Sequence, residues 1–413
     1  MTATVSDTPA SDLRTKLADL LRDRNIVHTL AVDAALRNVP RHLFLPGVSL
    51  QEAYANEAVY TKHDDSGGAC ISAASQPSMV AMMLEQLQLE PGQRVLELGA
   101  GTGYNAALMA AIVGAAGHVT TIDIDQDLID SARDHLDAAA VTNVDAVLGD
   151  GALGHSQAAP YDRVIATVGA FETPSAWLDQ LTPHGRLVVP LRLAGAACRS
   201  VIFERDQNGW SSPGSEMTVF MPLRGIADDA RRIIDLTADG AVSLQAHQDN
   251  DAANPCTLAG VLDTPGYPVW TGVLFAPGIS FEWLDLWLAC RLANPLMRMN
   301  VESAAKDSGL VSPMFPTVAM ATTTDDGSLA YLTIRRAQPT PDGEKRYEVG
   351  VIGHGPTGVH LAEHVGQEIT AWDTGFRTRR VRIAIPDTPP AADPNQGRFI
   401  LPRPHHSLTV TWE

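Results

Sequence analysis

The stretch from Val95 to Gly103 constrains the fold more than any other part of this chain. It reads Val-Leu-Glu-Leu-Gly-Ala-Gly-Thr-Gly and is followed by an alanine-rich segment from Tyr104 to Ile112. Residues 95–98 are predicted to form a short buried strand, and residues 104–112 a helix. The glycines between them allow a sharp turn and leave room for a ligand. Together these parts are the first half of a nucleotide-binding βαβ unit.

The spacing of the glycines narrows the class of ligand. Gly99, Gly101 and Gly103 follow the pattern Gly-x-Gly-x-Gly, whereas a dinucleotide-binding loop has its third glycine where this chain has Tyr104. The loop therefore suits a ligand that contains adenosine but no pyrophosphate, and S-adenosylmethionine is the commonest such ligand. A tight turn that binds nothing is the alternative, and the spacing of residues downstream disfavours it.

Acidic residues follow the next two predicted strands. Asp123 ends the strand predicted over 119–122, twenty residues beyond Gly103, where a carboxylate can accept hydrogen bonds from both ribose hydroxyls. Asp150 follows the strand predicted over 144–148, and we expect it to bond the adenine amino group. A solvated charge at a strand end is the alternative for Asp123.

Strands and helices alternate through this half of the chain, which predicts a mostly parallel sheet. The further strands are predicted over 161–168 and 185–190, and the further helices over 12–24, 29–38, 78–89, 128–139 and 174–181. The fold class that follows is α/β: a Rossmann-like domain with an expected S-adenosylmethionine site, preceded by N-terminal helices. Pro77 suits the first turn of its helix, and Ser75 is placed to cap that helix.

Size and composition bound the remaining possibilities. A chain of 413 residues is too long for one ordinary core, so we expect two domains. The formal net charge of −18 disfavours a nucleic-acid partner, because binding phosphates needs a basic face. No run of 18 apolar residues and no signal-peptide core occur, which predicts a cytoplasmic protein without a membrane span. No metal site is expected from the His405-His406 pair or from the scattered, reduced cysteines, Cys70, Cys198, Cys256 and Cys290.

The second half of the chain is predicted to be an α+β domain in which strands dominate. Strands are predicted over 200–205, 217–222, 318–321, 329–334, 347–351, 381–385 and 407–412, and helices over 228–235, 281–292 and 357–370.

Two features of this half have alternative interpretations. Trp283 and Trp287 lie four residues apart on one helix face, and a core face is favoured over a peptide-binding groove. The basic stretch comprises Arg377, Arg379, Arg380 and Arg382. It is interpreted either as a docking site for acidic peptides or, slightly favoured, as a solvated strand face.

Five segments occur in an order that resembles the protein-L-isoaspartate O-methyltransferase family. They are Val39–Phe44, Ser75-Gln76-Pro77, Val95–Gly103, Gly149-Asp150-Gly151 and Gly185–Pro190, and the resemblance covers roughly residues 10–195. It implies transfer of a methyl group from S-adenosylmethionine to the carboxylate of an isoaspartyl residue in a peptide. It also implies that Ser75 orients that carboxylate and that the cofactor is held by Gly99, Gly101, Asp123 and Asp150.

Two departures from the family pattern resemble one branch of it. The family has Thr-Ile where this chain has Ala73-Ala74, which places Ser72 and Ser75 in a Ser-x-x-Ser spacing. A turn or mobile loop is predicted just before, over 64–68. The chain also continues for more than two hundred residues beyond Pro190. Both features resemble the methyltransferases associated with ribosomally made peptides such as lanthipeptides and graspetides. Those enzymes esterify a normal aspartate, whose methyl ester cyclises to a succinimide and hydrolyses mostly to isoaspartate.

The chemistry of the reaction predicts the character of the site. A carboxylate with a pKa of about 4 is already ionised at neutral pH, so no general base is needed and orientation is the main requirement. The expected catalytic residues are therefore Ser75, Ser72 and Gln76. Arg41 and His42 are alternatives for steering a carboxylate, but their setting between prolines equally suits a structural role.

Two domains and a cofactor site are thus expected. Residues 1–195 would form the catalytic domain, with a helical cap at 1–77 and a Rossmann-like core at 78–195, and residues 196–413 would recognise a peptide. The expected cofactor-binding residues are Glu97, Gly99, Ala100, Gly101, Gly103, Asp123, Ile124, Gly149, Asp150 and Gly151.

Three functions are compatible with this site. The favoured one is esterification of an aspartate in a ribosomal precursor peptide, and general isoaspartate repair is the alternative. A peptide binder without activity is disfavoured, because Glu97, Asp123 and Asp150 are all present. The oligomeric state is left open.

Overall fold

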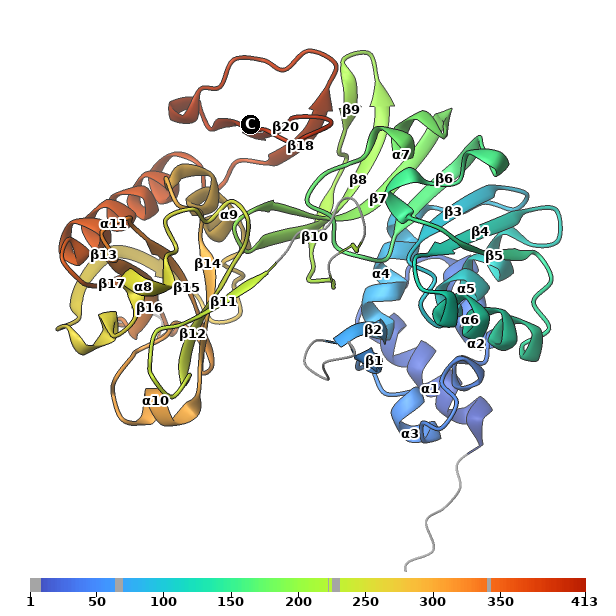
Figure 1. Ribbon diagram of the computed structural model, residues 1–413, viewed down its shortest axis with the longest axis horizontal. Helices are drawn as coiled ribbons and strands as arrows, with labels where there is room; N and C mark the ends of the chain where they lie inside the picture. Colours follow the sequence, from blue (N-terminus) through green and yellow to red (C-terminus); the bar gives the residue numbers. More distant parts are fainter. Residues whose placement is uncertain (1–8, 64–69, 222, 225–230, 340–342) are drawn as a thin grey trace, which may run out of the picture.

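The computed structural model describes residues 9–63, 70–221, 223–224, 231–339 and 343–413, so the turn predicted over 64–68 lies outside the described residues. Figure 1 shows two halves. In the half coloured blue to green, helices flank a parallel sheet, and in the half coloured yellow to red, helices pack on an antiparallel sheet.

The elements have the following bounds. The α-helices are α1 (Ala10–Asp23), α2 (Leu30–Asn38), α3 (Leu50–Ala53), α4 (Pro77–Leu87), α5 (Tyr104–Val113), α6 (Gln126–Ala138), α7 (Ser175–Asp179), α8 (Pro255–Leu258), α9 (Glu282–Arg291), α10 (Ser303–Asp307) and α11 (Gly358–Gly375). The strands are β1 (Val59–His63), β2 (Cys70–Ala74), β3 (Arg94–Leu98), β4 (His118–Asp123), β5 (Val144–Leu148), β6 (Tyr161–Ala166), β7 (Leu181–Ala194), β8 (Ala197–Asp206), β9 (Gly209–Ser211), β10 (Ser215–Met217), β11 (Arg232–Asp235), β12 (Val242–Ala246), β13 (Tyr267–Phe275), β14 (Met297–Val301), β15 (Val318–Thr323), β16 (Leu329–Arg336), β17 (Tyr347–His354), β18 (Val381–Pro386), β19 (Arg398–Leu401) and β20 (Leu408–Trp412).

The parallel part of the first sheet has the strand order β7-β6-β3-β4-β5. Successive side chains of a strand point to opposite faces, so each strand contributes to two cores. Val95 packs with the helices α1, α2, α4 and α5, whereas Leu96 belongs to the apolar cluster on the other face. The predicted Rossmann-like α/β fold is therefore confirmed, and its helices and strands end within a few residues of the predicted bounds.

The same sheet continues beyond residue 195. The boundary predicted there falls in the hairpin between β7 and β8, which pair antiparallel, and the sheet then extends through β9, β18, β20 and β19. One apolar cluster accordingly includes Leu96 from the first strand of the α/β core and Trp412 from the last strand of the chain. The two halves are thus joined by a shared sheet and a shared core.

The second sheet is antiparallel, with the order β11-β12-β14-β15-β16-β17-β13. Helices α9 and α11 pack together beside it (Figure 1). Trp287 on α9 is 1% exposed, and its ring centroid lies 4.2 Å from that of Phe376 and 5.2 Å from that of Trp412. Trp287 is therefore a core residue, as favoured, and not part of a peptide groove. Trp283 is half-buried, with the Arg199 guanidinium 3.9 Å from its ring centroid.

Two predicted elements of this half are wrong. The strand predicted over 217–222 is observed only as β10, which ends at Met217, and residue 222 lies outside the described part. The helix predicted over 228–235 is contradicted by strand β11 at Arg232–Asp235. There Ile234 is buried while Ile233 is 62% exposed, an alternation that fits a half-buried strand.

The basic stretch is largely engaged by the protein itself. Arg377 pairs with Asp373 at 2.6 Å, and Arg382 lies 3.4 Å from Asp206. Arg379 packs over the Phe376 ring, and Arg380 donates to the Pro213 carbonyl. This favours the structural interpretation of the stretch over a docking site.

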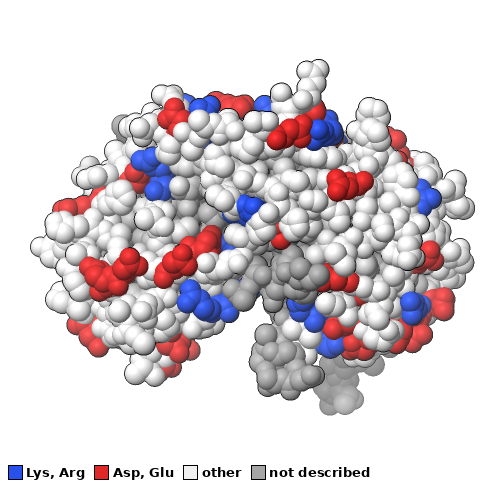
Figure 2. All heavy atoms as spheres, turned by 45° about the horizontal axis from the view of Figure 1, so that its top comes forward, with Lys and Arg blue, Asp and Glu red and all other residues white. Residues whose placement is uncertain are grey.

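Acidic and basic side chains are interspersed over both halves on the face shown in Figure 2. Among the described residues, no helix is long and apolar enough to cross a bilayer, and no three His, Cys, Asp or Glu side chains converge as metal ligands would.

Candidate active site

A cleft opens where β3, β4 and β6 end, which is where open α/β sheets bind their ligands. Its floor is the glycine loop. Gly99 has a φ of +107°, and a Cβ placed on it would lie 2.8 Å from Thr167 Oγ1. Gly103 has a φ of +83°, and its Cβ would lie 3.3 Å from the Ala132 carbonyl oxygen. Both positions therefore require glycine, for conformation and for space.

Glu97 is buried beneath this loop with both carboxylate oxygens bonded. The Asn105 amide donates to Oε1 at 2.8 Å and the Thr121 hydroxyl to Oε2 at 2.6 Å. Burial raises the pKa of Glu97 to about 7, although those two hydrogen bonds oppose the shift. The cleft therefore has an acidic group that titrates near neutral pH in its wall.

Asp123, at the end of β4, is held facing the loop. The Gly101 backbone N–H donates to its Oδ2 at 3.1 Å, and the Asp125 N–H donates to its Oδ1 at 3.3 Å. Asp125 in turn pairs with Arg224 at 2.6 Å and with Lys62 at 3.3 Å. These ion pairs tie two segments distant in sequence to the rim of the cleft beside Asp123.

The segment before α4 forms the wall opposite the glycine loop. Ser72 lies there, with its hydroxyl 4.0 Å from where a Cβ on Gly101 would be, and the Thr61 hydroxyl donates to it at 3.0 Å. Ser75 follows on the same wall. Its carbonyl accepts a hydrogen bond from Arg41 at 3.0 Å, and Arg41 also donates to the Ala53 carbonyl at 2.9 Å. Arg41 is fully buried, so it positions Ser75.

The capping role expected for Ser75 is wrong. Gln76 is the N-cap residue of α4 and makes no side-chain capping bond. The first turn is capped instead from outside the helix, by the Asn56 side-chain oxygen, which accepts from the Ser78 N–H at 2.9 Å. The Ser75 side chain is therefore not used for capping.

The structure brings most, though not all, of the predicted residues to the cleft. Those that line it are Ser72, Ser75, Glu97, Gly99, Gly101, Asp123, Ile124 and Gly151. Those that do not line it are Gln76, Ala100, Gly103, Gly149 and Asp150.

Local contacts explain why most of these residues lie away from the cleft wall. Gln76 donates to the Asn56 carbonyl at 2.8 Å, which contradicts a catalytic placement of its amide. Asp150 accepts from the Ala152 N–H at 2.8 Å and so caps a short 3-10 turn. Gly149 makes room for the Ile122 side chain, and Ala100 is buried beside α6. His42, an alternative for steering, bonds the Tyr54 hydroxyl at 2.8 Å and does not line the cleft.

Other lining residues were not predicted from the sequence. Phe220, Met221, Leu223 and Arg224 come from a segment that crosses to the end of β6, where the Gly169 N–H donates to the Met221 carbonyl at 2.6 Å. Thr167 also lines the cleft. The crossing segment carries no sequence motif, and the only local sign of an opening is the pair of small residues, Gly169 and Ala170, that follows the strand predicted over 161–168.

A family model described as Protein-L-isoaspartate(D-aspartate) O-methyltransferase (PCMT) matches residues 12–227. Protein-L-isoaspartate O-methyltransferase 2 of Archaeoglobus fulgidus is 40% identical over 219 residues, which cover 51% of this chain and 93% of that protein. The Methanothrix thermoacetophila protein-L-isoaspartate O-methyltransferase is 43% identical over 202 residues, or 49% of this chain and 91% of its own.

A solved structure of a protein-L-isoaspartate O-methyltransferase matches 87% of this chain and 92% of its own chain, at 22% identity and a TM-score of 0.49.

Proposed function

The chain belongs to the protein-L-isoaspartate O-methyltransferase family, and from this premise we propose that it methylates the free carboxylate of isoaspartyl residues in peptides or proteins. It is a carboxyl O-methyltransferase whose cofactor is S-adenosyl-L-methionine. The observation that supports the proposal most is that the family match spans the whole cleft, from the wall at Ser75 to the segment that contains Arg224.

The residues of the cleft fit this cofactor. The glycine loop would accommodate its polar end, because no side chain projects from Gly99 or Gly101. Asp123 is held at the end of β4, where it would accept from ribose hydroxyls. Ile122, Ile124 and Leu128 supply an apolar surface for the adenine.

When bound, S-adenosyl-L-methionine supplies a methyl group whose transfer to a carboxylate oxygen breaks the carbon–sulfur bond and leaves the electron pair on sulfur. The protein therefore needs to orient an ionised carboxylate and to exclude water, without moving a proton. The Ser75 hydroxyl is suited to donate to that carboxylate. Arg41 would keep Ser75 in place through the backbone. Tyr104, whose pKa is raised to about 12 by burial, stays neutral beside them.

A second candidate is esterification of a normal aspartate in a ribosomal precursor peptide. It is favoured by the second half of the chain, which shares a sheet with the catalytic half, and by Ala73-Ala74 in the cleft wall. In that case the backbone amide nitrogen of the next residue would attack the ester carbonyl and expel methanol, which forms a succinimide. We place it second because the proteins of similar sequence are named for isoaspartate.

Mass spectrometry separates the two candidates. Two peptides that differ only in an isoaspartyl or an aspartyl residue are incubated separately with the protein and S-adenosyl-L-methionine. The proposal predicts a mass gain of one methyl group on the isoaspartyl peptide. A gain on the aspartyl peptide alone, followed by loss of methanol, would overturn it in favour of the second candidate.

A further inference from the structure

A second cavity lies between the two halves, beside the cleft. Its volume is about 390 Å³, within the size range of ligand-binding pockets. Ala170 and Pro190 line it from the first half, and Gln245 and Met320 line it from the second. We refer to it as the junction cavity.

Among the described residues, the charged side chains that line the junction cavity are all basic, whereas the protein as a whole is acidic. Arg192, Arg231, Arg298 and His247 line it, and none of its described lining residues is Asp or Glu. The whole chain has 48 acidic and 30 basic residues, so a cavity lined in this way is unusual for it. A concave surface of one charge attracts ligands of the other.

Two of the arginines, Arg231 and Arg298, bond neutral groups and are suited to pair with an anionic ligand. Arg231 donates to the Phe220 carbonyl at 2.8 Å, and Arg298 donates to the Asn300 side chain at 2.9 Å. Neither forms an ion pair with a carboxylate among the described residues. Arg192 differs, because it pairs with Asp249 at 2.7 Å and its guanidinium lies 4.3 Å from the Phe171 ring centroid.

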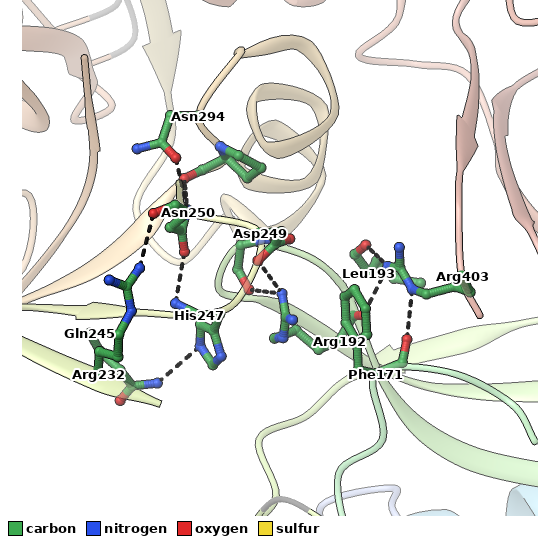
Figure 3. Close-up of polar contacts among 12 residues, drawn as sticks. Phe171, Arg192, Leu193, Arg232, Gln245, His247, Asp249, Asn250, Asn294 and Arg403 are labelled. Carbon is green, nitrogen blue, oxygen red and sulfur yellow. Dashed lines mark hydrogen bonds and ion pairs between the residues drawn. The ribbon is translucent and has the colours of Figure 1, made fainter. Parts of the chain in front are cut away.

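Several residues that line the cavity, among them Arg192 and His247, make polar contacts with their surroundings (Figure 3). The His247 N–H donates to Asn250 at 2.9 Å, and Asn250 donates to the Pro295 carbonyl at 2.8 Å. On the other side, Arg403 donates to the Phe171 carbonyl at 2.7 Å. Arg192 on β7 is contacted from both sides, since its guanidinium pairs with Asp249 in the loop after β12 and its carbonyl accepts from Arg403 of the C-terminal segment at 3.4 Å.

The junction cavity adjoins the cleft. Phe220 lines both. Val168 lines the cleft, and the next residue, Gly169, lines the cavity. An extended peptide advances about 3.3 Å per residue, so one with its reactive carboxylate in the cleft would place residues a few positions away in the cavity.

We propose that the junction cavity binds Asp or Glu side chains that flank the reactive residue of a peptide substrate, with Arg231 and Arg298 as their partners. This rests on the proposed function, since it takes a peptide to be the substrate. It assigns the second half of the chain a role in selecting acidic sequences.

The test measures peptide binding, so that it does not depend on turnover. Two fluorescent isoaspartyl peptides, one flanked by Asp and Glu and the other by Asn and Gln, are titrated with the full-length protein and followed by anisotropy. The variants are Arg231→Ala with Arg298→Ala, and as a matched control Arg336→Ala, an exposed arginine at the end of β16 that lines neither cavity nor cleft.

The unaltered protein should bind the acidic peptide about tenfold more tightly than the neutral one, with a preference that salt weakens. The double variant should lose that preference while the Arg336 control keeps it. Equal binding of the two peptides by the unaltered protein would overturn the inference, as would an equal loss in the control. Tighter binding of an oligonucleotide of the same charge would overturn it too. Absence of methyl transfer, by contrast, would count only against the proposed function.

Discussion

At the scale of single residues, Ser75 and Arg41 have different roles in the cleft wall. Ser75 presents a hydroxyl that caps no helix, while fully buried Arg41 holds its carbonyl at 3.0 Å. The motif order placed Ser75 at the site, but only the structure separated it from Gln76, whose amide is bonded to Asn56. The difference depends on contacts between residues twenty positions apart, which local sequence patterns do not report.

Replacing Ser75 with alanine tests its role. Ser75→Ala should lower kcat/KM for methyl transfer roughly 10- to 100-fold, because a hydrogen bond to a charged group contributes about 1.5–3 kcal/mol. The dissociation constant of S-adenosyl-L-methionine, measured by calorimetry, should not change. Ser78→Ala is the control, since Ser78 lies three residues further on, in the first turn of α4, and does not line the cleft. An unchanged kcat/KM in Ser75→Ala would exclude the assigned role.

Glu97 predicts a pH dependence of stability. Its pKa is about 7 in the folded protein against an ordinary value of 4.5, so between these values the folded state keeps a proton that the unfolded state has lost. The free energy of unfolding should therefore fall as pH rises through this window, by about 3 kcal/mol or less from this group. Denaturant titrations at pH 5 and pH 8 should show a smaller fall in Glu97→Gln. Identical falls in the two proteins would contradict the assignment.

At the scale of elements, two segments distant in sequence meet at Asp125, on the rim of the cleft. Lys62 on β1 and Arg224 on the crossing segment both pair with this carboxylate. The hydrogen bond from Arg224 lowers the pKa of Asp125, so both pairs persist through the neutral range. Asp125 therefore connects the β1–β2 hairpin to the rim beside Asp123.

Breaking this connection should weaken cofactor binding. Asp125→Asn removes both ion pairs, each worth about 0.2–1 kcal/mol, and should raise the dissociation constant of S-adenosyl-L-methionine about three- to tenfold. Asp130→Asn is the matched control, because its pair with Arg133 is exposed and away from the cleft. Equal dissociation constants for Asp125→Asn and the control would mean that the ion pairs do not contribute to cofactor binding.

Elements with a strong periodicity were predictable, and those defined by distant pairing were not. Helices α1, α4 and α6 were predicted from their apolar spacing, and β3 to β6 from alternation with helices. The errors fall between residues 217 and 235, where short strands are stabilised by pairing with β8 and β12. Such pairing is set by the tertiary fold, so local propensity misjudged it.

At the scale of the whole molecule, the two halves cannot be separated at the predicted boundary. β9 pairs with β18 across a long stretch of sequence, and the main core contains residues of both halves. No local signal in the sequence indicates that the C-terminal strands return to the first sheet. The fold class could therefore be predicted from the sequence, but the way in which the two halves are joined could not.

This joining predicts the outcome of truncation. A chain that ends at Pro190 would lose residues 191–194 of β7 and all of β8, and would expose the apolar cluster that includes Leu187 and Val189. Such a chain should be insoluble or lack a cooperative unfolding transition, measured by circular dichroism on heating. A soluble, cooperatively folding fragment would contradict the shared core.

The central claim, that the cleft methylates isoaspartyl carboxylates, is tested most directly by competition. Equal amounts of an isoaspartyl peptide and its aspartyl isomer are mixed with the protein and isotopically labelled S-adenosyl-L-methionine, and the label in each peptide is quantified after separation. We predict that nearly all the label enters the isoaspartyl peptide, because the ratio of the two kcat/KM values decides its distribution. Label found mainly in the aspartyl isomer would contradict the claim.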